Sequence, residues 1–302
     1  MSDAFKVDAH AAIATAWTDR LGSALKQHQP RSLELVGDWA DLSVFAGAVD
    51  SIRNLRLSGA ESDGRIRSLK GLQSFVGLES LSLANRVETG LDALATVPIE
   101  ALHATAQPGL LHCLTSTGIR RLSLGSADSA LFEGAETPPQ LAELSLIRPK
   151  LADLRCLAGF ETLNVLKLSH APQLDSLKGQ EALSRITQLA VETATRLADL
   201  AALERAFRLE SLRLVSAAKG AVHPNLGALG SLKILHLGGK EFGAVDWGAL
   251  LALPRLEKAF APWDPAVIER SAMEQRLPPT RRLRTFEPAG TRGLRMLFVE
   301  IE

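Results

Sequence analysis

A phrase of regularly spaced leucines recurs along most of this chain and limits what the chain can fold into. The clearest copy is LNVLKLSHAPQLDSLKGQEAL, which begins at Leu163. Ten copies begin with an aliphatic residue, and their starts lie 20 to 26 residues apart: Ile52, Leu78, Ile99, Ile119, Leu141, Leu163, Ile186, Leu209, Leu232 and Leu256. A degenerate copy at Pro30 makes about eleven. A fixed period of this size predicts a stack of repeated structural units.

The spacing L-x-x-L-x-L within this period resembles the leucine-rich repeat family, in its short bacterial-type class of about 22 residues. The resemblance covers about Pro30–Ala261. It implies an α/β solenoid, in which a curved parallel β-sheet lies opposite a convex side of 3₁₀ or short helical segments. Side chains alternate along a strand, so both strand leucines point to one face and bury against the neighbouring repeats.

One position departs from the usual family pattern. Many leucine-rich repeats have Asn or Cys three residues after the last strand leucine, where the side chain bonds the neighbouring backbones. This chain has Ala60, Arg86, Gln107, Ala127, Pro149, Ala171, Ala194, Ala217 and Lys240 there. The sequence therefore predicts no asparagine ladder, and the backbone of the bend must find other hydrogen-bond partners.

Residues 1–29 are predicted to form an N-terminal capping helix. Ile13, Trp17, Leu21 and Leu25 recur every four residues, which predicts an amphipathic helix over 8–27, with Asp8 as its N-cap. A solenoid needs its first repeat covered, so a cap is the favoured interpretation and a partner-binding helix the alternative.

The repeats are predicted to occupy residues 30–263, and residues 264–302 a C-terminal cap. Asp264-Pro265 is typical of a helix start, and this helix is expected to reach about Arg276. Residues 281–287 and 294–302 are predicted to form the two strands of a β-hairpin that blocks the open edge of the sheet. The second strand is apolar on both faces, which is typical of a covered strand. The arginines of this segment are interpreted as a solvated surface, with a basic contact patch as the alternative.

Composition excludes several classes of function. Lys+Arg and Asp+Glu both number 34, so no net field favours nucleic acid or an anionic membrane. The chain has no uninterrupted apolar run of about 18 residues, so we expect no membrane span. No secretory signal is recognisable, and Cys113 and Cys156 lie two repeats apart, about 10 Å at 4.8 Å per strand. We therefore expect reduced thiols and a cytoplasmic location.

Motifs that carry catalysis are missing from the sequence. It contains no C-x-x-C, H-E-x-x-H or G-x-S-x-G motif and no P-loop. His103 and His236 share one strand offset but lie six repeats apart, about 29 Å at 4.8 Å per strand, too far to share a metal. The sequence predicts no enzyme activity, catalytic residue, metal site or cofactor.

The outward face of the strands remains as the candidate binding surface. Residues two, four and six after each repeat start point away from the leucines, toward the concave side. Most are small, with isolated charges of both signs between them. The candidate binding residues are Arg56, His103, Arg121, Glu143, Lys167, Glu192, Arg213, His236 and Lys258. Such a mixed surface predicts another folded protein as the partner, and a monomer when unbound.

The predicted function is therefore that of a bacterial, non-enzymatic protein-interaction module. The resemblance admits a toxin-neutralising immunity protein, a regulatory scaffold or a delivered effector. A ubiquitin-ligase-like enzyme is disfavoured because the 39 residues after position 263 contain no cysteine. Nucleic-acid binding is disfavoured by the zero net charge and by the lack of interleaved aromatic residues.

Overall fold

The computed structural model describes residues 5–58, 66–217, 225–238, 242, 245–262, 274–275, 281–286 and 296–301. The chain divides into two compact units, Met1–Leu144 (unit 1) and Ser145–Glu302 (unit 2).

Unit 1 alternates short strands with short helical segments. Its strands are β1 (Phe5–Val7), β2 (Ala11–Ala14), β3 (Ser32–Val36), β4 (Asn54–Ser58), β5 (Ser80–Leu83), β6 (Ala101–Thr105) and β7 (Arg121–Gly125). Its helical segments are α1 (Asp19–His28), η1 (Ser43–Phe45), η2 (Leu72–Ser74), η3 (Leu91–Thr96), α2 (Leu110–Leu114) and η4 (Ser129–Leu131), where η marks a 3₁₀ helix. β1 and β2 are antiparallel, and each strand from β2 to β7 pairs in parallel with the next. β8 (Glu143–Ile147) contains the boundary between the units.

Unit 2 continues the same alternation. Its elements are η5 (Arg155–Leu157), β9 (Val165–Ser169), α3 (Gln180–Leu183), β10 (Gln188–Glu192), η6 (Ala201–Arg205), β11 (Ser211–Val215), η7 (Leu226–Ala228), β12 (Ile234–Gly238), α4 (Trp247–Leu251), β13 (Lys258–Pro262), β14 (Arg281–Phe286) and β15 (Met296–Ile301). β9 to β13 pair in parallel in chain order. β15 then pairs antiparallel with β13 on one side and with β14 on the other.

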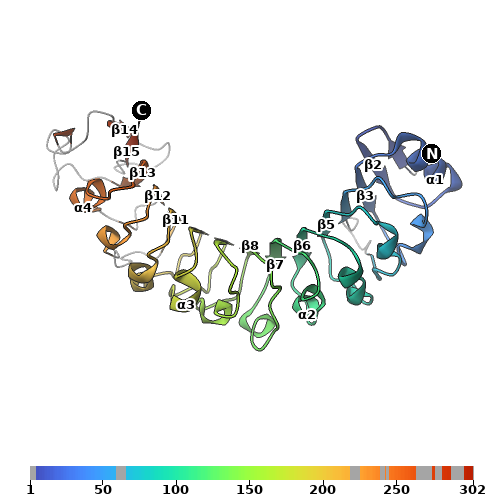
Figure 1. Cartoon of the computed structure of the whole chain (residues 1–302), viewed down its shortest axis with the longest axis horizontal. Coiled ribbons are helices and arrows are strands. Elements are labelled where there is room, and N and C mark those ends of the chain that lie inside the picture. Colours follow the sequence, from blue (N-terminus) through green and yellow to red (C-terminus); the bar gives the residue numbers. More distant parts are fainter. Residues whose placement is uncertain are drawn as a thin grey trace. The chain divides into compact units, whose positions relative to one another are not determined.

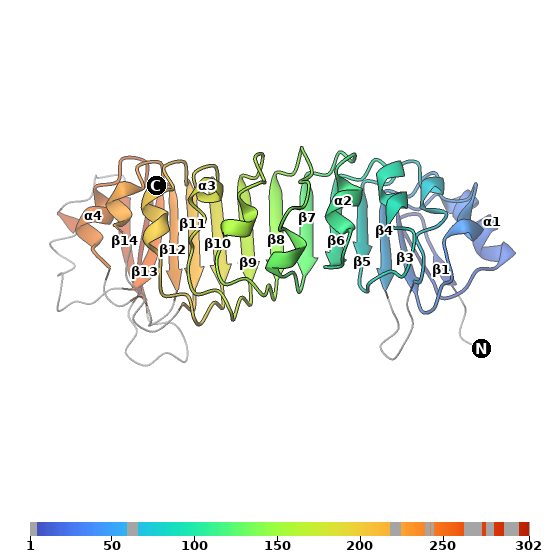
Figure 2. The same cartoon turned by 90° about the horizontal axis from the view of Figure 1, so that it is seen from below.

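The leucines of neighbouring strands lie in register, which builds the core of each unit. Leu55, Leu81, Leu102 and Leu122 form one row in unit 1, and each is at most 1% exposed. Leu166, Leu189, Leu212 and Leu235 form the matching row in unit 2. Within each unit the helical segments lie on one face of the strands (Figures 1 and 2). Leucines of these segments, such as Leu72 and Leu157, are buried like the strand leucines. The predicted fold class, a leucine-rich repeat solenoid, is confirmed.

The backbone groups in the bend after each strand form hydrogen bonds without an asparagine ladder. The residue seven positions after the start of several repeats has a positive φ of 52° to 58°: Ser126, Arg148, His170, Thr193 and Ser216. In unit 2 the main-chain N–H of Arg148, His170, Thr193 and Ser216 donates to the last strand carbonyl of the following repeat, at 2.8 to 3.0 Å. The ladder positions themselves hold the buried residues Ala127, Pro149, Ala171, Ala194 and Ala217. Main-chain donors thus replace the side-chain bonds, and small residues let the repeats stack closely.

Gln107 is a polar exception at the ladder position. Its side chain is buried, and its Oε1 accepts a hydrogen bond from the main-chain N–H of Val87 in the preceding repeat, at 3.2 Å. Its Nε2 has no hydrogen-bond partner among the described residues. Gln107 therefore bonds one neighbouring repeat, as a ladder asparagine would, but does not bond the next.

The helix predicted over 8–27 is wrong in its first half. Residues 5–14 form the hairpin β1–β2, and the Asp8 carboxylate accepts hydrogen bonds from the N–H groups of His10 and Ala11 in its turn. The helix begins only at Asp19, because Thr18 is the N-cap and its Oγ1 accepts from the N–H of Leu21. Leu21 and Leu25 are buried as expected, whereas Ile13 lies on β2 and is 44% exposed.

Within the segment predicted as a C-terminal hairpin, the described strands β14 and β15 pair antiparallel. The helix predicted from Asp264-Pro265 to Arg276 lies almost entirely outside the described residues. The capping roles of both terminal segments stay predictions.

Candidate interaction surface

The strand side chains that point away from the leucine core form a surface that we call the open face. The nine predicted binding residues all lie there, and none of them is buried: Arg56, His103, Arg121 and Glu143 in unit 1, and Lys167, Glu192, Arg213, His236 and Lys258 in unit 2. These nine side chains are therefore accessible on the open face, and their role in binding stays a prediction.

In unit 1 two opposite charges of the open face lie close together on neighbouring strands. Arg56 on β4 lies beside Glu34 on β3, with 3.5 Å between Arg56 Nε and Glu34 Oε1. The hydroxyl of Ser58 also donates to Glu34, at 2.7 Å. Arg121 and His103 make no ion pair among the described residues. The structure thus does not gather the predicted residues of unit 1 into one cluster.

In unit 2 three predicted residues contact one another across consecutive strands. Arg213 on β11 donates from Nε to the Glu192 carboxylate on β10, at 2.5 Å. Its Nη1 lies 3.0 Å from Nδ1 of His236 on β12. His236 in turn packs on Phe260 of β13, with 4.6 Å between the ring centroids. The four side chains form a continuous chain of contacts, and its polar members hold the Arg213 guanidinium in one orientation.

The environment of His236 favours its neutral form. Burial lowers the pKa of His236 below its ordinary value, the positive charge of Arg213 lowers it further, and Glu192 opposes these effects. A neutral imidazole has a lone pair on one ring nitrogen, so Nδ1 can accept from Arg213. The ring therefore serves as a hydrogen-bond acceptor for Arg213 near neutral pH.

The open face of unit 2 also exposes apolar side chains. Ile147 is 47% exposed and Ile234 is 43% exposed, and Val165, Val215 and Phe260 are half-buried. Apolar side chains among fixed charges are the usual content of a protein–protein contact, because the apolar groups supply the burial and the charges the specificity.

The terminal hairpin adds two residues that sequence reasoning did not assign to the surface. Phe260 on β13 pairs with Phe298 on β15, and Phe298 pairs with Arg284 on β14. Directly paired residues share one face of a sheet, so Phe298 and Arg284 continue the line of Arg213, His236 and Phe260. We call these five residues the aromatic–arginine row. Side chains alternate between the two faces of β15, so the sequence of residues 294–301 divides them into two sets. Only the pairing of β15 with β13 shows which set lies on the open face.

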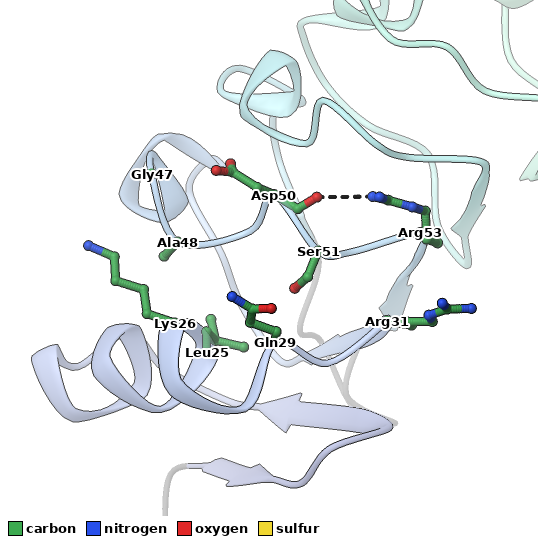
Figure 3. Close-up of a pocket in the computed structure, with 9 residues that line it drawn as sticks. All are labelled: Leu25, Lys26, Gln29, Arg31, Gly47, Ala48, Asp50, Ser51 and Arg53. Atoms are coloured by element: carbon green, nitrogen blue, oxygen red, sulfur yellow. Dashed lines mark hydrogen bonds between the residues drawn. The ribbon is translucent and has the colours of Figure 1, made fainter.

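The lining of a separate depression of about 530 Å³ in unit 1 includes the cationic residues Lys26, Arg31 and Arg53 and the anionic residue Asp50 (Figure 3). Nη1 of Arg53 donates to the main-chain carbonyl of Asp50 at 2.9 Å, and Lys26 and Arg31 extend away from each other on opposite sides (Figure 3). The three charges do not converge on one point, so the depression does not form a site for one small anion.

The described residues contain no group of three or more His, Cys, Asp or Glu side chains placed to hold a metal ion. Burial, together with Asp92, raises the pKa of the Cys113 thiol, which leaves less of the nucleophilic thiolate at neutral pH. Among the described helices, none is long and apolar enough to cross a membrane.

No protein-family model matches the sequence, and a search of curated proteins finds no match. Among solved structures, the chain is similar to the internalin InlF from Listeria monocytogenes, at 18% sequence identity and a TM-score of 0.49, over 78% of this chain and 69% of that one. It is also similar to the functional domain of InlJ from Listeria monocytogenes, at 12% identity and a TM-score of 0.42, over 90% of this chain and 64% of that one. The chain thus spans less than two thirds of the InlJ domain.

Proposed function

We propose that this protein is a non-enzymatic interaction module that binds another protein through the open face of its sheet, chiefly in unit 2. The observation that carries the proposal is the set of contacts from Glu192 through Arg213 and His236 to Phe260, next to the exposed side chain of Ile234. Arginine and aromatic side chains are over-represented among residues that dominate protein–protein binding energy. An arginine already held by two neighbours loses less side-chain entropy when a partner binds.

The energetic balance favours a binding role for these charges over a role in folding. The Arg213 side chain is 44% exposed and Glu192 is 41% exposed, so their ion pair is screened by water. Exposed pairs of this kind contribute about 0.2–1 kcal/mol to stability. A buried interface removes that screening, and the same charges then discriminate strongly between partners.

A charge reversal tests the proposal. We expect Arg213→Glu to leave the thermal unfolding midpoint nearly unchanged and to weaken capture of the native partner at least tenfold, about 1.4 kcal/mol, because it places an acid where the partner's acid binds. The matched control is Arg208→Glu, since Arg208 lies between η6 and β11 and not on the open face. Capture is measured by quantitative affinity enrichment from the native source.

A second variant shows which unit binds the partner. If Arg121→Glu weakens capture and Arg213→Glu does not, the open face binds in unit 1 and its assignment to unit 2 is wrong. If both variants capture the partner as well as the Arg208→Glu control does, the open face is not the binding surface.

A further inference from the structure

We infer that the aromatic–arginine row of unit 2 binds an acidic segment of the partner, in which apolar side chains lie between two carboxylates. This inference rests on the proposed function and specifies the chemistry of the partner. The row consists of Arg213, His236, Phe260, Phe298 and Arg284, on five successive strands of the sheet.

The charge of the surface points to an acidic partner. Among the described open-face side chains of unit 2, the cations are Lys167, Arg213, Lys258 and Arg284, and the anion is Glu192. In unit 1 the excess is smaller, because the cations Lys6, Arg56 and Arg121 share the face with the anions Glu34 and Glu143. A zero net charge for the whole chain thus conceals a cationic open face in one unit, which attracts and orients acidic groups.

The order of residues along the row specifies the segment further. Arginines occupy both ends, and the two phenylalanines and the half-buried imidazole lie between them. Four strand spacings of about 4.8 Å separate Arg213 from Arg284, about 19 Å in all. An extended segment advances about 3.3 Å per residue, so two acids about six residues apart reach both arginines. Every second side chain between them then faces the aromatic rings.

The Arg213 guanidinium keeps donors for such a ligand. Guanidinium has five N–H donors in a planar fork. Nε is used by Glu192 and Nη1 by His236, so the remaining N–H groups can bind an incoming carboxylate. Arg284 is exposed at the other end of the row. Contacts with neighbouring side chains thus orient one anchor before binding, which lowers the entropy cost of association.

The test uses fluorescein-labelled peptides and the full chain, with binding measured by fluorescence anisotropy. The probe ESLSLSE places two acids and two leucines on one face of an extended chain. The matched peptides are KSLSLSK, with reversed charge, and ESASASE, without the apolar groups. We expect the full chain to bind ESLSLSE at least tenfold more tightly than either control peptide, and salt to weaken this binding.

Variants connect the binding to the row. Arg284→Ala and Arg213→Ala should each weaken ESLSLSE binding at least fivefold, whereas Arg56→Ala in unit 1 should leave it unchanged. Circular dichroism melts confirm that each variant is folded. Equal binding of ESLSLSE and KSLSLSK, or an acidic preference that survives Arg284→Ala, overturns the inference. If the inference fails while Arg213→Glu still abolishes partner capture, the proposed function stands and only the partner chemistry is wrong.

Discussion

At the residue scale, the bends contain backbone strain that a consensus pattern does not reveal. Thr193 has a φ of 57°, in the left-handed region, and it is β-branched, which makes this conformation especially unfavourable. Its N–H donates to the carbonyl of Val215 at 2.9 Å, so the next repeat holds the strained conformation in place. The requirement at this position is for a backbone geometry and not for a particular side chain.

We therefore predict that Thr193→Gly stabilises the protein by about 0.5–1 kcal/mol. Relief of left-handed strain of about 1–2 kcal/mol outweighs the added entropy of the unfolded chain, about 0.5–1 kcal/mol. The control is Ser169→Gly on β9, where the strand conformation suits any residue and glycine should destabilise. Urea titrations followed by circular dichroism measure both. If Thr193→Gly lowers the urea midpoint, the Thr193 side chain makes a contact that stabilises the protein by more than the backbone strain destabilises it.

At the element scale, pairing partners decide which face of a strand is buried. In β2 the residues Ala12 and Ala14 are buried and Ile13 is exposed. The reason is the parallel register with β3, which places Ala12 beside Leu33, Ala14 beside Leu35 and Ile13 beside Glu34. The prediction that Ile13 is a core residue of an amphipathic helix is therefore wrong. Ile13 is the largest apolar residue of β2, but the smaller residues Ala12 and Ala14 are the ones buried.

Close packing between successive helical turns leads to a second prediction. Gly71, with a φ of 93°, immediately precedes η2, and a Cβ on it would lie 2.4 Å from the main chain of Leu42 and Ser43. Gly109 precedes α2 with a φ of 78°, but nothing lies within 4 Å of its Cβ position. Gly109→Ala should cost about 1–2 kcal/mol of backbone strain.

Gly71→Ala should destabilise the chain at least twice as much as Gly109→Ala, since it adds a main-chain clash to the same kind of strain. Thermal melts of the two variants make the comparison. Equal losses would mean that η1 and η2 move apart without cost.

At the scale of the whole molecule, each repeat depends on its neighbours for burial. Residues 5–28 of unit 1 lie against the first repeat, since β2 pairs with β3, and Leu21 and Leu25 are buried. Trp17 also packs edge-on against Phe45, with 5.0 Å between ring centroids. Loss of this segment would expose both the backbone edge of β3 and an apolar surface.

We predict that a chain lacking residues 1–28 unfolds at a lower temperature and associates in solution. Exposed strand edges pair with other chains, and a solenoid without its end cover is less soluble. Differential scanning calorimetry and light scattering after size exclusion measure the two effects. A truncated chain that stays monomeric and melts like the full chain would show that the segment is not a cap.

The sequence by itself determined the repeat, its register and the face on which the charged residues lie. Leucine spacing carries this information because strand side chains alternate, so the buried positions also define the exposed ones. It did not determine the hairpin β1–β2, the left-handed bends or the aromatic–arginine row. These depend on pairing between segments. Phe298 and Arg284 join Phe260 only through the antiparallel pairing of β13, β15 and β14. Tertiary structure decides such neighbours, since residues distant in the chain select each other by hydrogen bonding and burial and not by local propensity.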